Sequence, residues 1–180
     1  MQDRTNRAGP PRGRTSAAFL LAQVGSHAAT KFAERLAPLA LSPPHAGILR
    51  VLSAGGGMSQ QGLCTMLGIL PSRLVGLVDE LEGRGLIERR DCPEDRRSYA
   101  LHVTEEGRQT LEAIGRIARE HDAALCAALS EKEWEQLRSV LQRIAEQQGL
   151  TPGVHPGFKR LGRSSDAKGE GASVVKRRRA

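Results

Sequence analysis

Apolar residues recur at helical spacing over most of the chain between residues 16 and 148. The first stripe places one every three or four positions, at Leu21, Val24, Ala28, Phe32, Leu36 and Leu39. This period is that of one face of an amphipathic helix. Ser16 suits the N-cap of this helix, and Pro38 distorts or ends its last turn. We therefore predict a long helix before residue 41.

Shorter helical runs follow, separated by glycine and proline. Ser42 followed by Pro43 is a helix start, and the glycines at 55–57 end that helix. Ser59 caps a second helix, which Gly68 ends within about three turns.

A third short helix begins at Pro71, almost immediately after the second. Its core face lies at positions i, i+3, i+4 and i+7, namely Leu74, Leu77, Val78 and Leu81. Gly83 and Gly85 terminate it. Two short helices joined by a tight turn form a helix-turn-helix.

Two strand-like runs come next, at residues 86–91 and 99–104. One face of the second run holds Tyr99, Leu101 and Val103, which alternate with Ala100 and His102. This alternation is typical of a half-buried strand. The polar loop between the runs carries Pro93, Glu94, Asp95, Arg96 and Arg97. We predict a β-hairpin with a charged tip, a wing.

Helical spacing then returns. Thr104 suits an N-cap, and an apolar seam follows with spacings of three and four at Leu111, Ile114, Ala118, His121, Leu125 and Ala128. Such a heptad-like seam is typical of helices that pair. Ser130 and Glu133 form a capping box that opens a last helix. The apolar face of that helix holds Trp134, Leu137, Leu141 and Ile144.

The net charge of +7 is carried by the two ends of the chain. Residues 1–15 have a net charge of +3 and residues 151–180 of +6, which leaves −2 for residues 16–150. Gly, Pro and basic residues without periodicity predict a disordered arm at 1–15 and a disordered tail at 149–180. The overall charge is thus a weak indicator of nucleic-acid binding, and local clustering matters more.

Several classes of protein are disfavoured. No run of about 18 apolar residues predicts a transmembrane helix, and residues 1–15 lack the apolar middle of a secretory signal. Cys64, Cys92 and Cys126 are far apart and odd in number, which disfavours a disulfide framework. Since metal-ligand spacing and catalytic or phosphate-cradling motifs are also missing, we expect a cytoplasmic protein that is not an enzyme and needs no metal or cofactor.

The exposed face of the helix that begins at Pro71 has chemistry suited to DNA. Because the core face is fixed, the opposite face shows Ser72, Arg73 and Gly76, with Val75 at its edge. Free amides at a helix N-terminus, a hydroxyl and a guanidinium suit phosphates and base edges. Arginine binds guanine bidentately in the major groove, Gly76 permits close approach, and Val75 fits a thymine methyl.

The wing adds a second group of arginines. Arg96 and Arg97 at its tip fit a neighbouring minor groove or its phosphates. Asp95 is placed to orient one of them by an ion pair. Three further arginines lie nearby for contacts with the DNA backbone, at Arg84, Arg89 and Arg90.

These segments together resemble the signature of the MarR family of bacterial transcriptional regulators. The resemblance is carried by residues 67–68, 71–75, 77–82, 84–89, 93–97 and 101–107. Its most specific part is the Asp-Arg-Arg wing followed by the Leu-x-x-Thr-x-x-Gly step. The match in helix order extends over residues 16–148.

The resemblance implies a mainly α fold with a small β-hairpin wing. Residues 42–107 would form a winged helix-turn-helix lobe, and the helices of 16–41 and 108–148 would interlock in a homodimer. It also implies that the helix from Pro71 enters the major groove, while Arg97 reaches the minor groove with support from Asp95. The two lobes would bind a palindromic operator with half-sites about 10 bp apart, and the protein would be a ligand-responsive repressor.

The sequence departs from the family pattern at three positions. Leu70 stands where many members place a capping Ser, Thr or Asp. Arg73 and Gly76 stand where others often have Thr and a basic residue. An operator sequence therefore cannot be transferred from the family to this chain.

Many members of that family bind small, often phenolic, acids between the dimerisation helices and the lobe. The candidate effector-binding residues here are His27, His45, Arg50 and His121. The alternative is that the three histidines are packing or surface residues. Other members sense oxidants through cysteine, and Cys92 in the wing would be exposed, although neighbouring acids disfavour its thiolate.

Two other functions stay open. The winged helix could be a module for protein contacts, in which case Arg73 and Arg97 would be neutral to DNA binding. The chain could instead be a general nucleic-acid-binding or architectural protein that acts through its basic ends.

Overall fold

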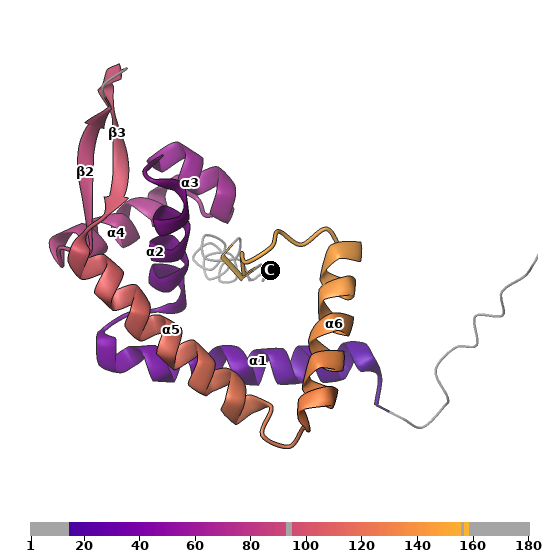
Figure 1. The fold of residues 1–180 in the computed structure, drawn as a ribbon. Coiled ribbons are helices and arrows are strands. Elements are labelled where there is room, and N and C mark those ends of the chain that lie inside the picture. Colours follow the sequence, from indigo (N-terminus) through magenta and orange to yellow (C-terminus); the bar gives the residue numbers. More distant parts are fainter. Residues whose placement is uncertain (1–14, 93–94, 156, 159–180) are drawn as a thin grey trace, which may run out of the picture.

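The computed structural model describes residues 15–92, 95–155 and 157–158, without the side chains of 92 and 95–98. The fold is mainly helical with one small sheet (Figure 1). In chain order the elements are α1 (Ala17–Leu36), the 3-10 helix η1 (Ala37–Leu39), α2 (Pro43–Gly55), β1 (Met58–Ser59), α3 (Gln60–Leu67), α4 (Pro71–Gly83), β2 (Ile87–Cys92), β3 (Asp95–Val103), α5 (Glu105–Leu125) and α6 (Glu131–Gln147).

The predicted helix starts are confirmed by side-chain caps. Ser16 Oγ accepts the N–H of Phe19 at 3.2 Å, and Ser59 Oγ accepts the N–H of Gly62 at 3.1 Å. Ser130 opens α6 with the predicted capping box. Each cap satisfies an amide that would otherwise lack a partner in the first turn.

The lobe formed by α2, α3, α4 and the sheet encloses the apolar core. Its fully buried side chains include Ile48, Leu49, Leu52, Leu63, Leu67, Leu74, Val78, Leu81, Ile87 and Leu101. Each buried side chain of this size contributes about 1.5–3 kcal/mol to folding. The predicted core face of α4 is thereby confirmed, and its opposite face is left outward.

Over the described residues, no single helix is long and apolar enough to cross a membrane. Helices α3 and α4 reach that apolar length only as a pair bent by 115°. Their apolar side chains belong largely to the core of the lobe.

The sheet has three antiparallel strands in the order β1-β3-β2. The two-residue strand β1 was not predicted, and it pairs Met58 with Leu101. Strand β3 also starts earlier than predicted, so the hairpin is longer and projects away from the helices (Figure 1). Leu101 and Val103 are buried as predicted, but Tyr99 is 56% exposed because it lies farther along the hairpin.

Helix α5 packs along α1 and leads away from the lobe. Ile114 of the predicted seam is buried, and the ring of His121 lies 5.5 Å from that of Phe32 on α1. The seam therefore begins as a contact within the chain, and only its later residues are exposed. These are Ala118, Leu125 and Ala128.

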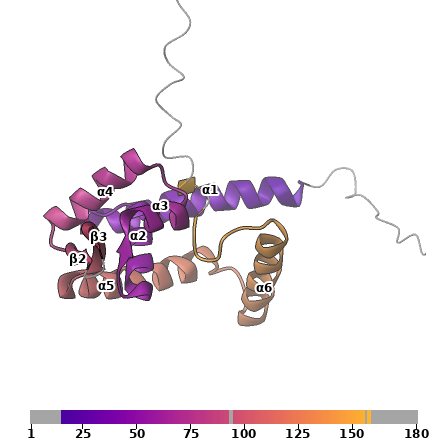
Figure 2. The ribbon, with the colours of Figure 1, turned by 90° about the horizontal axis from the view of Figure 1, so that it is seen from above.

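Helix α6 lies at the end of the molecule opposite the sheet (Figures 1 and 2). It buries none of its residues within its own chain. Large exposed apolar residues gather on α6 and on the first half of α1, at Phe19, Leu20, Leu21, Val24, Leu137, Val140, Leu141 and Ile144. Both helices thus present apolar faces to the outside.

The chain after α6 differs from the predicted disordered tail. Residues 148–155 return from α6 toward α2 (Figure 1). Phe158 then lies in the core of the lobe and is only 6% exposed. The packed part of the protein accordingly extends ten residues beyond the predicted boundary. The predicted arm up to residue 14 and the tail from 159 lie outside the described residues.

Candidate nucleic-acid interface

The turn between α3 and α4 sets the direction of α4. Gly68 takes a left-handed conformation with φ 63°, and its N–H bonds to the carbonyl of Cys64 at 2.8 Å. Glycine adopts this conformation without steric cost. Ile69 is buried, so the turn is fixed to the core. The axes of α3 and α4 meet at 115° and the first turn of α4 is left at the surface.

The structure brings the predicted α4 residues together on one exposed face. Pro71, Ser72, Arg73, Val75 and Gly76 are all exposed. Nothing lies within 4 Å of the position that a Cβ on Gly76 would occupy. The face therefore combines a guanidinium, a hydroxyl and a small apolar patch without a bulky side chain at its centre.

The amides of this helix end are fewer than predicted. Leu70 provides no side-chain cap, and Pro71 has no N–H. The N–H of Arg73 bonds to the carbonyl of Leu70 at 3.0 Å, as does that of Leu74. Among the described residues this leaves Ser72 as the open amide of the first turn, so the Ser72 hydroxyl and Arg73 side chain provide most of the polar chemistry.

Arg84 makes a contact within the chain that the sequence did not predict. Its guanidinium donates to the carbonyl oxygens of Ala40 at 2.7 Å and Leu39 at 2.8 Å. These carbonyls follow α1, at the end of η1, where they lack helical partners. Arg84 therefore joins the end of α4 to the end of α1, and this contact engages the group that was expected to meet the DNA backbone.

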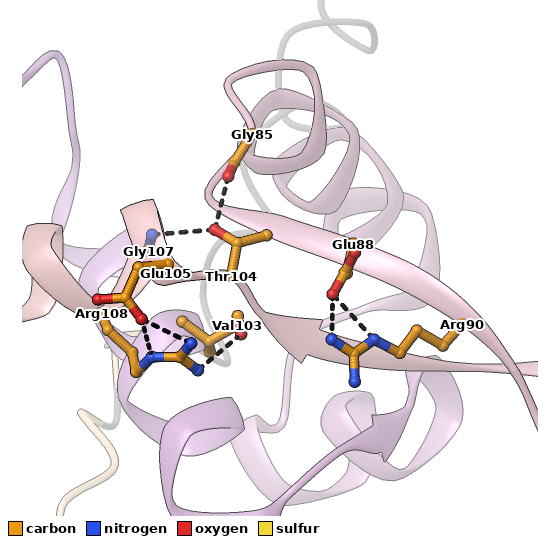
Figure 3. Close-up of polar contacts among 8 residues, drawn as sticks. All are labelled: Gly85, Glu88, Arg90, Val103, Thr104, Glu105, Gly107 and Arg108. Atoms are coloured by element: carbon orange, nitrogen blue, oxygen red, sulfur yellow. Dashed lines mark hydrogen bonds and ion pairs between the residues drawn. The ribbon is translucent and has the colours of Figure 1, made fainter.

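Arg89 and Arg90 are also engaged within the chain. Arg89 pairs with two acids on α4, Asp79 at 2.6 Å and Glu82. It thus braces β2 against α4. Arg90 Nε donates to Glu88 at 2.8 Å on the other face of the hairpin (Figure 3). The sequence could not predict these partners because they depend on how β2 packs beside α4.

The wing residues Asp95, Arg96 and Arg97 begin β3, and the backbone of Asp95 is paired with Cys92 of β2. The register shifts between Asp91 and Cys92, as in a β-bulge. The side chains of Asp95, Arg96 and Arg97 lie outside the described residues. Their predicted contacts with DNA and with one another therefore stay predictions.

Thr104 and Gly107 join the wing, the end of α4 and the start of α5. Thr104 Oγ1 accepts the N–H of Gly107 at 3.0 Å and donates to the carbonyl of Gly85 at 2.6 Å (Figure 3). A Cβ on Gly107 would collide with the carbonyl oxygen of Leu86 and lie 2.7 Å from Val103 Cγ1. The close packing at this junction thus explains the Thr and the Gly of the Leu-x-x-Thr-x-x-Gly step.

His45 lies inside the lobe and reaches α4. It is buried, with Nδ1 3.1 Å from the backbone nitrogen of Ser42 and Nε2 3.1 Å from Glu80 Oε2. Burial lowers the pKa of His45, while the nearby Glu80 carboxylate acts in the opposite direction. The structure therefore gives this predicted effector residue a position between α2 and α4.

The other predicted effector residues lie apart from His45. His27 is exposed on α1, and His121 contacts Phe32, where burial followed by the charge of Arg35 lowers its pKa. Arg50 lies against Gly153 after α6. The four residues are not brought into one pocket.

Two surface hollows lie elsewhere. A shallow groove of about 500 Å³ follows α5, lined by Leu111, Glu112, Gly115, Arg116 and Arg119. A smaller hollow of about 160 Å³ lies between α2, the sheet and α5, lined by Leu52, Ser53, Gly56, Gly57, Arg90, His102, Val103 and Arg108. Neither is lined by the predicted effector residues.

The described cysteines have features that disfavour redox chemistry. Burial raises the pKa of the Cys64 thiol, and burial together with Asp122 raises the pKa of Cys126. A raised pKa reduces the thiolate that reacts. The side chain of Cys92 is outside the described residues. Within the described part of the chain, metal-binding side chains do not gather in groups of three.

The sequence and the fold both match known regulators. Residues 41–98 match the model of the MarR family. A transcriptional regulatory protein for the hcr operon of Thauera aromatica is 36% identical over 112 residues, which covers 62% of this chain and 68% of that protein. This identity over this length is enough to establish common family membership.

Solved structures give the same result. The transcriptional repressor CouR bound to a 23-mer DNA duplex is 34% identical with a TM-score of 0.64, covering 72% of this chain and 92% of that one. CouR from Rhodococcus jostii bound to p-coumaroyl-CoA is 32% identical with a TM-score of 0.59, covering 71% and 90%. MarR from E. coli in its apo form has a TM-score of 0.65, covers 73% and 98%, and at 20% identity supports the fold alone.

Proposed function

Because this chain belongs to the MarR family of transcriptional regulators, we propose that it binds a palindromic operator as a homodimer and represses transcription until a small aromatic ligand releases it. Regulation of transcription follows from family membership. The operator symmetry, the direction of regulation, the dimer and the ligand are proposed here.

The observation that carries DNA recognition is the exposed face of α4. Its opposite side is fixed in the core by Leu74 and Val78, so Ser72, Arg73 and Val75 face outward together. A major groove about 12 Å wide admits one α-helix. With α4 in the groove, Arg73 would bind a base edge and Ser72 a phosphate.

The apolar faces of α1 and α6 support a homodimer. Leu137, Leu141 and Ile144 on α6 are each between 37% and 39% exposed, and Val24 on α1 is 50% exposed. A contiguous exposed apolar surface marks an interaction site. A second copy supplies the same faces, and its lobe would bind the second half-site.

The proposed ligand class rests on a relative whose bound ligand contains an aromatic acyl group. CouR was solved both with DNA and with p-coumaroyl-CoA. An aromatic acid, free or as its CoA thioester, is therefore the class to test on this chain. The effector residues remain His27, His45, Arg50 and His121 as predictions.

A footprint of the DNA upstream of the protein's own gene tests the function. We expect two protected half-sites about one helical turn, ~10 bp, apart. A reporter placed behind this DNA should be silenced by the protein and released by the aromatic ligand. Uniform protection without half-sites would support the general nucleic-acid-binding alternative.

Deleting residues 159–180 separates specific recognition from binding through the basic end. That segment holds all eight Lys and Arg residues found after residue 150. Its loss should reduce the salt dependence of binding while the footprint stays in place. If the deletion abolishes binding and the Arg73→Ala and Arg97→Ala variants bind normally, the basic end is the DNA-binding element and the proposed role of α4 is wrong.

A further inference from the structure

A glycine in the middle of α2 lies directly against the ring of Phe158. A Cβ on Gly47 would lie 2.8 Å from Phe158 Cζ and 2.9 Å from Cε2, which is closer than carbon atoms pack. Glycine inside a helix is destabilising relative to alanine. Packing therefore explains why glycine stands at position 47: without a side chain, it leaves a slot on α2 that the phenyl ring of Phe158 fills.

The segment that carries Phe158 is shaped by two consecutive turns. The N–H of Val154 bonds to the carbonyl of Thr151 at 3.1 Å, and that of Phe158 to the carbonyl of His155 at 3.0 Å. The ring of His155 lies 6.0 Å from the ring of Phe158. These local contacts orient the phenyl ring toward α2.

Two further contacts hold the segment on the lobe. Val154 packs against the apolar core. Gly153 has φ 71° and lies against the guanidinium of Arg50. A Cβ on Gly153 would be only 3.2 Å from Arg50 Nη2. The segment is thus seated at three places on α2 and its surroundings, through Gly153, Val154 and Phe158.

The segment links two parts of the molecule that are otherwise far apart. It starts at the end of α6, which buries no residue in its own chain and lies opposite the sheet (Figures 1 and 2). It ends in the core of the lobe that carries α4. Burial of an aromatic ring is among the larger apolar contributions available to a short segment.

We propose that residues 150–155 and 157–158, the C-terminal strap, dock Phe158 into the Gly47 slot in order to fix the lobe relative to the dimerisation helices. This rests on the proposed function as a DNA-binding dimer. Two lobes bind one operator well only when their separation matches the half-site spacing. Each strap braces one lobe and so narrows the range of spacings that the dimer accepts.

The seating of the ring is tested without DNA. Labelling with 4-fluorophenylalanine gives one ¹⁹F signal for each of the three phenylalanines, and Phe158→Leu assigns the strap signal. In the full chain this signal should resist broadening by a soluble nitroxide. Gly47→Ala fills the slot and should shift the signal and make it broaden.

The matched control is Gly55→Ala in the same helix, where a Cβ would meet only Met58 Cε at 3.9 Å. This variant should leave the strap signal unchanged. A Phe158 signal that broadens in the unmodified chain as readily as free fluorophenylalanine means that the slot is empty, which overturns the proposal.

The effect on the lobe is tested with Phe158→Ala, which keeps every charge of the chain. Affinity is measured for operators with the natural spacing and with one or two base pairs inserted between the half-sites. The operator affinity of the unmodified dimer should fall about tenfold with each inserted base pair, and that of the variant about threefold. Lobes held in a fixed arrangement tolerate less displacement of the half-sites. Should Phe158→Ala not fold, Phe158→Leu keeps an apolar side chain without the ring.

The outcomes separate the two proposals. If the unmodified protein binds no operator at all, the proposed function fails and the strap's proposed role fails with it, while the fluorine measurement still decides whether the slot is filled. If the unmodified protein binds and Phe158→Ala has the same spacing profile, the strap does not brace the lobe and only the strap proposal is wrong.

Discussion

His45 on α2 and Glu80 on α4 lie side by side, with Nε2 and Oε2 3.1 Å apart. His45 Nδ1 accepts the backbone N–H of Ser42, which requires a free lone pair there. In the neutral ring, this contact places the proton on Nε2, toward Glu80. The two atoms are close but not aligned as a hydrogen bond, and Nε2 has no other acceptor among the described residues.

The lobe should become less stable as the pH is lowered, because His45 is buried. Burial lowers its folded-state pKa below the usual value near 6.5, against the opposing effect of Glu80, while the charges of Arg84 and Arg73 lower it further. The unfolded chain then binds the proton first, so stability is complete above about pH 6.5 and is lost as pH falls toward the folded-state pKa. His45→Gln should reduce this loss, as measured by urea unfolding between about pH 7.5 and 5.5.

Ser26→Ala is the control for this experiment, because Ser26 is exposed on α1 and carries no titratable group. It should retain the pH dependence of the unmodified protein. His121, whose pKa is also lowered by burial, adds a loss in the same direction in every variant. Identical pH profiles for His45→Gln and the unmodified chain would show that His45 is not the titrating group.

Removing the Arg73 side chain should weaken operator binding. We expect Arg73→Ala to cost about 1–3 kcal/mol and to relax the preference at one base pair, since a bidentate contact with a base edge is lost. Gel shifts with the operator and with singly substituted operators measure both effects. Arg116→Ala removes the same charge from an exposed position on α5 and should change affinity little. Equal losses on every sequence would assign Arg73 to a phosphate instead.

Adding a methyl group at Gly107 should disturb the junction between wing and α5. The new Cβ would collide with the carbonyl of Leu86, and overpacking of this kind costs typically 1–3 kcal/mol, here taken as about 2. Gly115→Ala in the same helix would meet only the mobile end of Arg119 at 3.5 Å. That control should be neutral or slightly stabilising in thermal unfolding, and a loss of equal size in both variants would contradict the close contact.

The apolar face of α6 should be required for dimerisation. Leu141→Glu places a charge in the proposed interface, so we expect a monomer by light scattering after size exclusion and a large loss of operator affinity. Ser139→Glu introduces the same charge on the opposite side of α6, where residue 139 is exposed. It should remain a dimer. If the Leu141→Glu protein still had the mass of a dimer in solution, the dimer contact would lie elsewhere.

Much of the fold could be predicted because its signals are local. The caps at Ser16, Ser59 and Ser130 and the glycine at 68 act within a few residues of their position, and the core face of α4 follows from its period. Strand β1 could not be predicted, since two residues show no period and its pairing depends on β3.

The exposed residues of α4 were predictable for the same reason, but the partners of the arginines were not. The acceptors of Arg84 lie 44 and 45 residues earlier in the chain, and no local pattern connects them. Phe158 was missed because its surroundings have the composition of a disordered tail. The ring of Phe158 packs against Gly47, and neither residue is part of a periodic pattern that the sequence shows.

The contact from Arg84 to the carbonyls of Leu39 and Ala40 has a consequence for the order of folding. It closes a loop that contains α2, α3 and α4, and such closure has an entropic cost that neighbouring contacts do not have. We expect these hydrogen bonds to form after the helices they enclose. Truncating Arg84 should then accelerate unfolding while leaving the folding rate nearly unchanged. The guanidinium therefore acts chiefly by slowing the unfolding of the folded lobe.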